Sequence, residues 1–129
     1  MKFGKSHNNK DSLSRKEYIY LIGLEDFENE VLKEKIPVLV LCMHQDPEFH
    51  TQVEIVERIK DEIYGDGLKI CLLEEESVGV FKAKYNVGGT PTFLVFSNGK
   101  EIARILGQTE PAILKEFLFQ TLIPEKVKD

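Results

Sequence analysis

The sequence predicts an α/β fold in which a central mixed β-sheet is flanked by helices on both faces. Residues 38–43 form a continuous apolar run, and residues 68–73 form a second run that is apolar except for Lys69; both are typical of strands that are covered on both faces. Segments with helical spacing of apolar residues alternate with these runs, and this order favours a sheet between two helical layers. Asn98-Gly99 stands between two further strand-like segments and predicts a tight antiparallel hairpin.

The chain begins its alternation with a short strand followed by a helix. Residues 18–22 are β-branched and aromatic, which favours a strand. In residues 26–34, Phe27 and Val31 stand four apart, so we expect a helix with one buried side. The buried strand of residues 38–43 follows.

A longer helix is predicted after this strand. Asp46 is a suitable N-cap, and Pro47 would take the first helical position. The glycines of residues 65–67 predict the end of the helix. Its expected apolar face consists of Phe49, Val53, Val56, Ile59 and Ile63.

In the second half, the buried strand of residues 68–73 runs into three glutamates at 74–76. This acidic run has two interpretations, a solvated strand exit or an acidic docking patch. A short helix is expected over residues 78–85. Strands at 92–96 and 101–106 then flank the hairpin turn.

Pro111 opens the last predicted helix. The expected order is therefore strand, helix, strand, helix, strand, helix, two strands and helix. The apolar face of the last helix consists of Ile113, Leu114, Phe117, Leu118 and Leu122.

Length and composition predict one soluble domain. The 129 residues carry a net charge of −5, which disfavours binding to a nucleic acid backbone. No apolar stretch approaches the roughly 20 residues that span a bilayer, so we expect no membrane partner. Residues 1–15 are polar and basic and predict a flexible tail without a signal peptide, before a domain at 16–129. The expected compartment is the cytoplasm.

Residues 85–100, YNVGGTPTFLVFSNGK, resemble the Y-x-V-x-x-x-P-T-x-x-x-F-x-x-G-K/E block of the thioredoxin family. The similarity extends over roughly residues 18–123 and implies the thioredoxin fold. It also implies that Pro91 is the cis-proline beside the active site, although only about 5–6% of X-Pro bonds are cis in general.

The sequence departs from this family where the W-C-G-P-C motif would stand. The matching residues are His44, Gln45, Asp46, Pro47 and Glu48. Gln45 replaces the attacking cysteine and Glu48 the resolving cysteine, so neither step of dithiol exchange has its thiol. The sequence therefore predicts a variant that lacks the CxxC motif and its redox chemistry.

The two cysteines are the remaining candidates for thiol chemistry. Cys42 and Cys71 lie within predicted buried strands, where cysteine behaves as a small apolar residue. The alternative is an atypical thiol–disulfide oxidoreductase that uses Cys42 or a partner's thiols. We expect no cofactor and no metal.

The polar residues around the predicted loop offer two further alternatives to a solvated loop. One is a metal site made by His44, Asp46, Glu48 and His50, but nothing in their spacing brings these side chains to one face. The other is an acid–base pair of His44 and Glu48.

The resemblance also implies a binding surface. In the family, the backbone of the residue before the proline pairs with an extended peptide, and Thr90 holds that position here. We expect a protein or extended peptide to bind at residues 44–48 together with Gly89, Thr90 and Pro91. The alternative is that the glycines only satisfy turn geometry. We expect a monomer or a weak homodimer that associates through the edge strand at residues 102–106.

Overall fold

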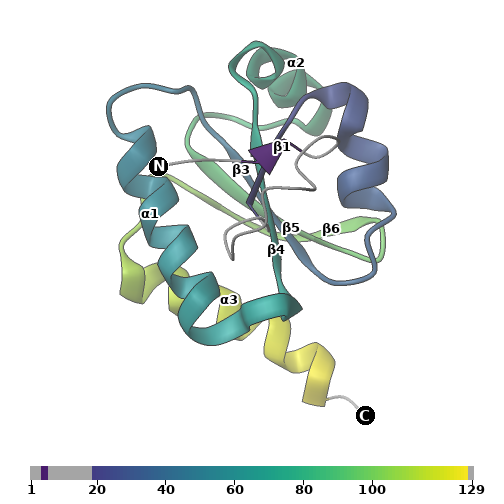
Figure 1. The fold of residues 1–129 in the computed structure, drawn as a ribbon, viewed down its shortest axis with the longest axis vertical. Helices are drawn as coiled ribbons and strands as arrows, with labels where there is room; N and C mark the ends of the chain where they lie inside the picture. Colours follow the sequence, from purple (N-terminus) through teal and green to yellow (C-terminus); the bar gives the residue numbers. More distant parts are fainter. Residues whose placement is uncertain (1–3, 6–18, 128–129) are drawn as a thin grey trace.

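The computed structural model of the chain describes residues 4–5 and 19–127. Its centre is a six-stranded mixed sheet in the order β1-β2-β4-β3-β5-β6 (Figure 1). The strands β2, β4 and β3 are parallel, whereas β5 runs antiparallel to both β3 and β6. The strands are β1 (Gly4–Lys5), β2 (Ile19–Ile22), β3 (Val38–Cys42), β4 (Lys69–Leu73), β5 (Thr92–Ser97) and β6 (Lys100–Leu106).

Helices cover both faces of this sheet, which confirms the predicted α/β architecture. On one face lie α1 (Phe49–Ile59) and α3 (Pro111–Val127). On the other lie α2 (Glu75–Tyr85) and the helical turns η1 (Leu24–Asp26) and η2 (Glu28–Leu32) (Figure 1). The order of elements is the predicted one, with β1 as an addition.

The strand β1 was not expected from the sequence. Gly4 and Lys5 pair in parallel with Tyr20 and Leu21 at the edge of the sheet. The remainder of the predicted tail, residues 1–3 and 6–15, lies outside the described residues, and so does Tyr18.

The helix predicted at residues 26–34 forms two short pieces instead of one α-helix. The N–H of Lys33 donates to the carbonyl of Glu28 at 2.9 Å, which is the i→i+5 bond of a π-helical turn. A spacing of four residues puts Phe27 and Val31 on one side in either helix type. Both side chains are buried as predicted, so the spacing identified the buried side and not the helix type.

The helix after β3 also differs in detail from its prediction. Its regular part begins at Phe49 rather than at Pro47. It continues into a second π-helical turn, η3 (Lys60–Tyr64), before the η4 turn (Gly65–Gly67). The wider π turn rotates the apolar face, and Ile63, predicted as buried, is 46% exposed.

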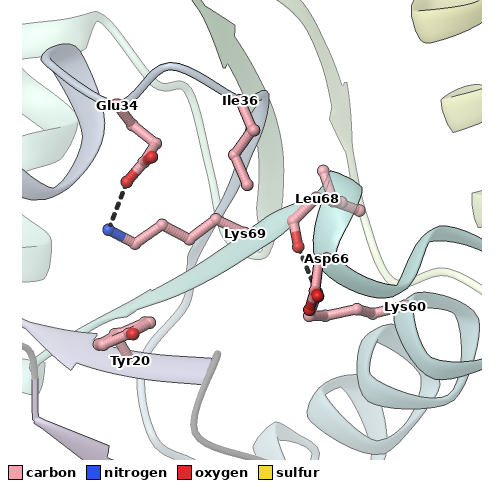
Figure 2. Close-up of a pocket in the computed structure, with 7 residues that line it drawn as sticks. All are labelled: Tyr20, Glu34, Ile36, Lys60, Asp66, Leu68 and Lys69. Carbon is pink, nitrogen blue, oxygen red and sulfur yellow. Dashed lines mark hydrogen bonds and ion pairs between the residues drawn. The ribbon is translucent and has the colours of Figure 1, made fainter. Parts of the chain in front are cut away.

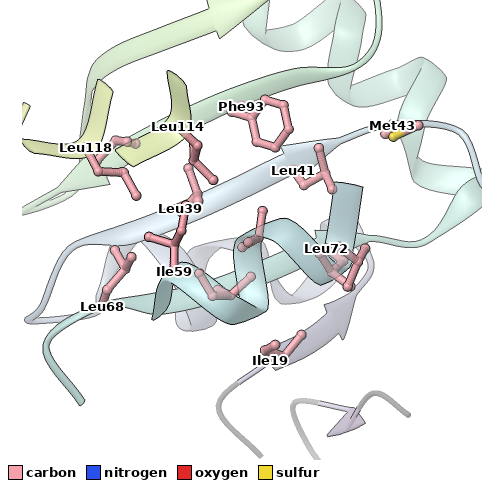
Figure 3. Packing of buried hydrophobic residues seen from close by; sticks show 14 of the residues in the cluster. Ile19, Leu39, Leu41, Met43, Ile59, Leu68, Leu72, Phe93, Leu114 and Leu118 are labelled. Carbon is pink, nitrogen blue, oxygen red and sulfur yellow. The ribbon is translucent and has the colours of Figure 1, made fainter. Parts of the chain in front are cut away.

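Two apolar clusters hold the layers together. One lies between the sheet and helices α1 and α3, where Leu39 and Phe93 from the strands meet Leu114 and Leu118 of α3 (Figure 3). The other lies between the opposite face and α2 with η2, and it includes Cys42 and Cys71. The period-two alternation of the strands therefore divides their side chains between two dry cores.

Candidate functional site

The loop of residues 44–48 lies where β3 leaves the sheet. Its five side chains are exposed. Cys42 pairs with Thr92 in the antiparallel ladder of β3 and β5. The chain that leaves β3 and the chain that enters β5 therefore lie at the same end of the sheet, and residues 44–48 and Thr90 belong to these two connections.

The entry into α1 is an Asx turn. Oδ1 of Asp46 accepts a hydrogen bond from the N–H of Glu48 at 3.0 Å, and the Asp46 carbonyl accepts one from Phe49 at 2.9 Å. Asp46 thus satisfies two backbone donors at this helix start, although the helix proper begins later than expected. Pro47 lies within the turn.

A carboxylate from another element holds the start of this loop. Oε1 of Glu75, in the first turn of α2, accepts a hydrogen bond from the N–H of Gln45 at 2.7 Å. Oε2 of the same carboxylate lies 2.7 Å from Nδ1 of His44. The Gln45 N–H, and after it His44, lower the pKa of Glu75 from its ordinary value. His44 is therefore paired with Glu75 and not with Glu48, as one alternative required.

The second part of the site is the turn before β5. The peptide bond between Thr90 and Pro91 is cis, as the resemblance implies. The Thr92 hydroxyl donates to the Gly89 carbonyl at 2.7 Å, and the Gly107 N–H donates to the Pro91 carbonyl at 2.8 Å. These two bonds hold the backbone on both sides of Thr90.

Thr90 itself keeps its backbone groups available. Its N–H and carbonyl have no hydrogen-bond partner among the residues that the structure describes. Its side chain is partly exposed. The turn therefore presents one donor and one acceptor at the sheet end, next to the loop of residues 44–48.

An exposed apolar side chain lies beside this turn. Leu106, the last residue of β6, is 63% exposed. Its Cδ1 lies 3.7 Å from the point where a Cβ on Gly89 would stand. Gly89 thus leaves the Leu106 side chain uncovered next to Thr90.

Neither of the two thiols is exposed at this surface. Cys42 and Cys71 are free and fully buried. Burial raises the pKa of Cys42 to about 11 and that of Cys71 to about 12. Both thiols are therefore protonated at neutral pH, which disfavours nucleophilic attack.

No group of three or more His, Cys, Asp or Glu side chains in residues 4–5 and 19–127 is arranged to hold a metal ion. His50 belongs to α1 and packs edge-on against the ring of Phe49. No helix of the described part is long and apolar enough to cross a membrane.

A hollow lies at the opposite end of the sheet, where the start of β4 meets residues of β2, η3 and η4 and the connection before β3 (Figure 2). Nζ of Lys69 donates to Glu30 Oε1 at 2.8 Å and to Glu34 Oε1 at 3.0 Å. Nζ of Lys60 donates to the carbonyls of Gly65 and Leu68. Protein groups therefore bind both ammonium groups that line this hollow.

Two residues of the site escaped the sequence analysis. Glu75 belonged to an acidic run with two general interpretations, and its place beside Gln45 depends on β4 lying next to β3. Leu106 looked like an ordinary strand residue. The sequence did contain a signal for Glu75. Two parallel strands end at the same edge of the sheet, so the helix that follows β4 begins beside the loop that follows β3.

Comparisons with known proteins agree with this geometry. The family described as thioredoxin-like domain matches the chain over residues 5–122. No curated protein matches it.

Proposed function

The chain belongs to the thioredoxin-like domain family, and on that premise we propose that it is a redox-inactive member that binds an extended segment of another protein. The segment would lie between the loop of residues 44–48 and the turn at Thr90. It would add backbone hydrogen bonds to the sheet end, a mode of peptide recognition that needs no enzyme chemistry.

The observation that carries this proposal is the open backbone of Thr90. Its N–H and carbonyl lack partners among the described residues, while the bonds at Gly89 and Pro91 hold the turn in place. A rigid turn with one donor and one acceptor can pair with a peptide at little entropic cost. Leu106 supplies apolar contact beside it.

The side chains at positions 45 and 48 cannot perform thiol–disulfide exchange. Gln45 and Glu48 have no sulfur, so neither can form the mixed disulfide or resolve it. Cys42 is buried with a raised pKa, which argues against the alternative of an atypical oxidoreductase that uses this thiol. An insulin-reduction assay with dithiothreitol tests this part, since turnover above background that is lost in Cys42→Ser would establish the alternative.

Peptide capture is tested with two substitutions at one position. Thr90→Pro removes the N–H donor, and Thr90→Ala keeps both backbone groups. A panel of extended peptides, screened by fluorescence anisotropy, should give binders to the wild type and to Thr90→Ala. Thr90→Pro should weaken these binders at least about 10-fold, because a backbone pairing site is lost.

A fold defect in Thr90→Pro would be detected by circular dichroism. In that case the same binders are mapped on the wild-type protein by NMR. Chemical-shift changes centred on the Thr90 and Gln45 amides support the proposal. Peptides that bind elsewhere, or a panel without any binder, would overturn it.

We also propose that the protein acts in the cytoplasm as a monomer or weak homodimer. Two free thiols suit a reducing compartment. β6 is the edge strand that a second copy would use. Light scattering across a concentration series measures the association, and fluorescence microscopy of a tagged chain reports the compartment.

A further inference from the structure

Five connecting segments meet at the end of the sheet that carries Thr90. A series of hydrogen bonds links them. The Leu24 N–H donates to the Ser77 hydroxyl at 3.1 Å. Glu75 forms hydrogen bonds with His44 and Gln45, at the start of the loop of residues 44–48. Gln52 exchanges two hydrogen bonds with the backbone of Thr109, at 2.9 and 3.3 Å. The Gly107 N–H donates to the Pro91 carbonyl, which links the connection after β6 to the turn before β5.

We name this end of the molecule the acidic pole and define it by residues 23–26, 43–48, 74–77, 88–91 and 107–110. These segments contain eight carboxylates and no lysine or arginine. Outside these segments, positions 19–127 carry eleven acidic and eleven basic residues. The eight are Glu25, Asp26, Asp46, Glu48, Glu74, Glu75, Glu76 and Glu110.

Glu75 is paired with His44, but three other carboxylates of this pole have no counter-ion among the described residues. Glu48, Glu76 and Glu110 are exposed, and none of them forms an ion pair with a described residue. The nearest guanidinium along β6, that of Arg104, is held by Glu101 and by the carbonyls of Tyr85 and Asn86.

The opposite end of the sheet is different, because its connections mix both signs. Lysines 33, 35 and 60 stand there beside Glu34, Asp61, Glu62 and Asp66. The one-sided distribution of charge therefore coincides with the open backbone of Thr90.

We propose that the segment captured at Thr90 is cationic: an extended stretch of a partner protein that carries lysine or arginine on both sides of an apolar residue. This inference rests on the proposed peptide capture. The backbone pairs with Thr90, the apolar residue contacts Leu106, and the flanking cations face the carboxylates of the acidic pole. A field of one sign around a binding turn raises the association rate of ligands of the opposite sign and disfavours ligands of the same sign.

The test uses three synthetic peptides with one apolar centre, flanked by lysine, by glutamine or by glutamate. Their affinities for the full chain are measured by fluorescence anisotropy at low salt. The lysine peptide should bind at least about 10-fold more tightly than the glutamate peptide. Raising the salt from about 0.05 to about 0.5 M should reduce this ratio, because the Debye length becomes shorter.

Substitutions then locate the effect. Glu48→Lys and Glu110→Lys should each weaken the lysine peptide about 3-fold or more and leave the glutamine peptide nearly unchanged. Glu62→Lys makes the same change of charge near the far end of the helical segment that starts at Phe49, and it should have little effect. Thr90→Pro should weaken all three peptides alike.

The outcomes separate this inference from the function on which it rests. If all three peptides bind equally well and Thr90→Pro still weakens them, the cationic preference is wrong and peptide capture stands. If Glu62→Lys acts as strongly as Glu48→Lys, the acidic pole is not the recognition surface. If no peptide of any charge binds, peptide capture itself fails.

Discussion

Glu75 Oε2 lies 2.7 Å from Nδ1 of His44, so the first turn of α2 is tied to the loop that follows β3. The other oxygen of this carboxylate takes the Gln45 N–H. A carboxylate so close to position 45 would raise the pKa of any thiol placed there, which is the opposite of what a nucleophilic cysteine needs. The loop is thus held by chemistry that suits a binding surface and opposes thiolate formation.

Removal of this carboxylate should loosen the loop. In Glu75→Ala we expect the Gln45 amide to exchange with solvent about 2- to 10-fold faster, as typical of one lost hydrogen bond. Hydrogen exchange followed by NMR measures it. Glu76→Ala is the matched control, because Glu76 is also exposed in the first turn of α2 and forms no hydrogen bond or ion pair with the loop among the described residues. Equal exchange rates in the wild type and in Glu75→Ala would show that Glu75 does not hold the Gln45 amide in solution.

The same contact should depend on pH. Because the pKa of Glu75 is lowered in the folded protein from 4.5, its contacts are complete above that pH. They are lost as the pH falls through the lowered value. The carboxyl ¹³C shift of Glu75 should therefore titrate with a midpoint below 4.5, and His44→Ala should raise this midpoint only in part because the Gln45 N–H remains. A wild-type midpoint at or above 4.5 would show that the carboxylate is unbonded in solution.

The thiols should be inert in the native protein. A rise of the Cys42 pKa from 9.0 to about 11 lowers the thiolate fraction near neutral pH about 100-fold, and burial slows access further. Labelling with dithiobis(nitrobenzoate) should be at least that much slower than in denaturant, where both thiols react. Rapid native labelling of Cys42 would revive the oxidoreductase alternative.

Restored cysteines should restore chemistry. In Gln45→Cys/Glu48→Cys, two thiols stand just before the α1 start, where the helix dipole lowers a thiol pKa. We expect insulin reduction well above the wild-type background, and a further gain when Glu75→Gln removes the nearby charge. Gln45→Ser/Glu48→Ser is the control without sulfur. A folded but inactive double cysteine variant would show that more than the thiols separates this chain from active relatives.

Lys69 should stabilise the fold rather than bind a ligand. Its side chain is 11% exposed, and burial alone would lower its pKa. The hydrogen bond to Glu30, together with the other electrostatic contacts that include the hydrogen bond to Glu34, outweighs burial and raises the pKa of Lys69. Figure 2 shows the contact between Lys69 and Glu34. Lys69→Met leaves both carboxylates without this cation and should lower the free energy of unfolding by about 2–3 kcal/mol in chemical denaturation.

The control for Lys69 is the exposed pair of Lys33 and Glu28, whose atoms lie 3.8 Å apart. Lys33→Met should change stability by less than about 1 kcal/mol. Adding Glu30→Gln and Glu34→Gln to Lys69→Met should recover most of the loss. A similar loss for Lys33→Met and Lys69→Met would argue against the paired arrangement.

Local patterns were sufficient for most of the fold. The Asn98-Gly99 turn has positive φ at both residues, as an antiparallel two-residue turn requires. The two apolar runs are the central buried strands β3 and β4. The helix predicted at 78–85 begins at Glu75 instead. Its first turn contains acidic residues, which stabilise a helix N-terminus, whereas the prediction relied only on the spacing of apolar residues. The π-helical turns were also missed, since their spacing resembles that of an α-helix over one turn.

The sequence alone determined which chemistry is missing and which strands are buried, because side-chain identity and periodicity are local properties. Only the tertiary structure decided that Glu75 reaches Gln45 across 30 positions, and that acidic residues from separate connections lie at the sheet end that carries Thr90. The physical reason is the strand order. With β4 between β2 and β3, their parallel carboxyl ends deliver three chain segments to one place, beside the antiparallel start of β5.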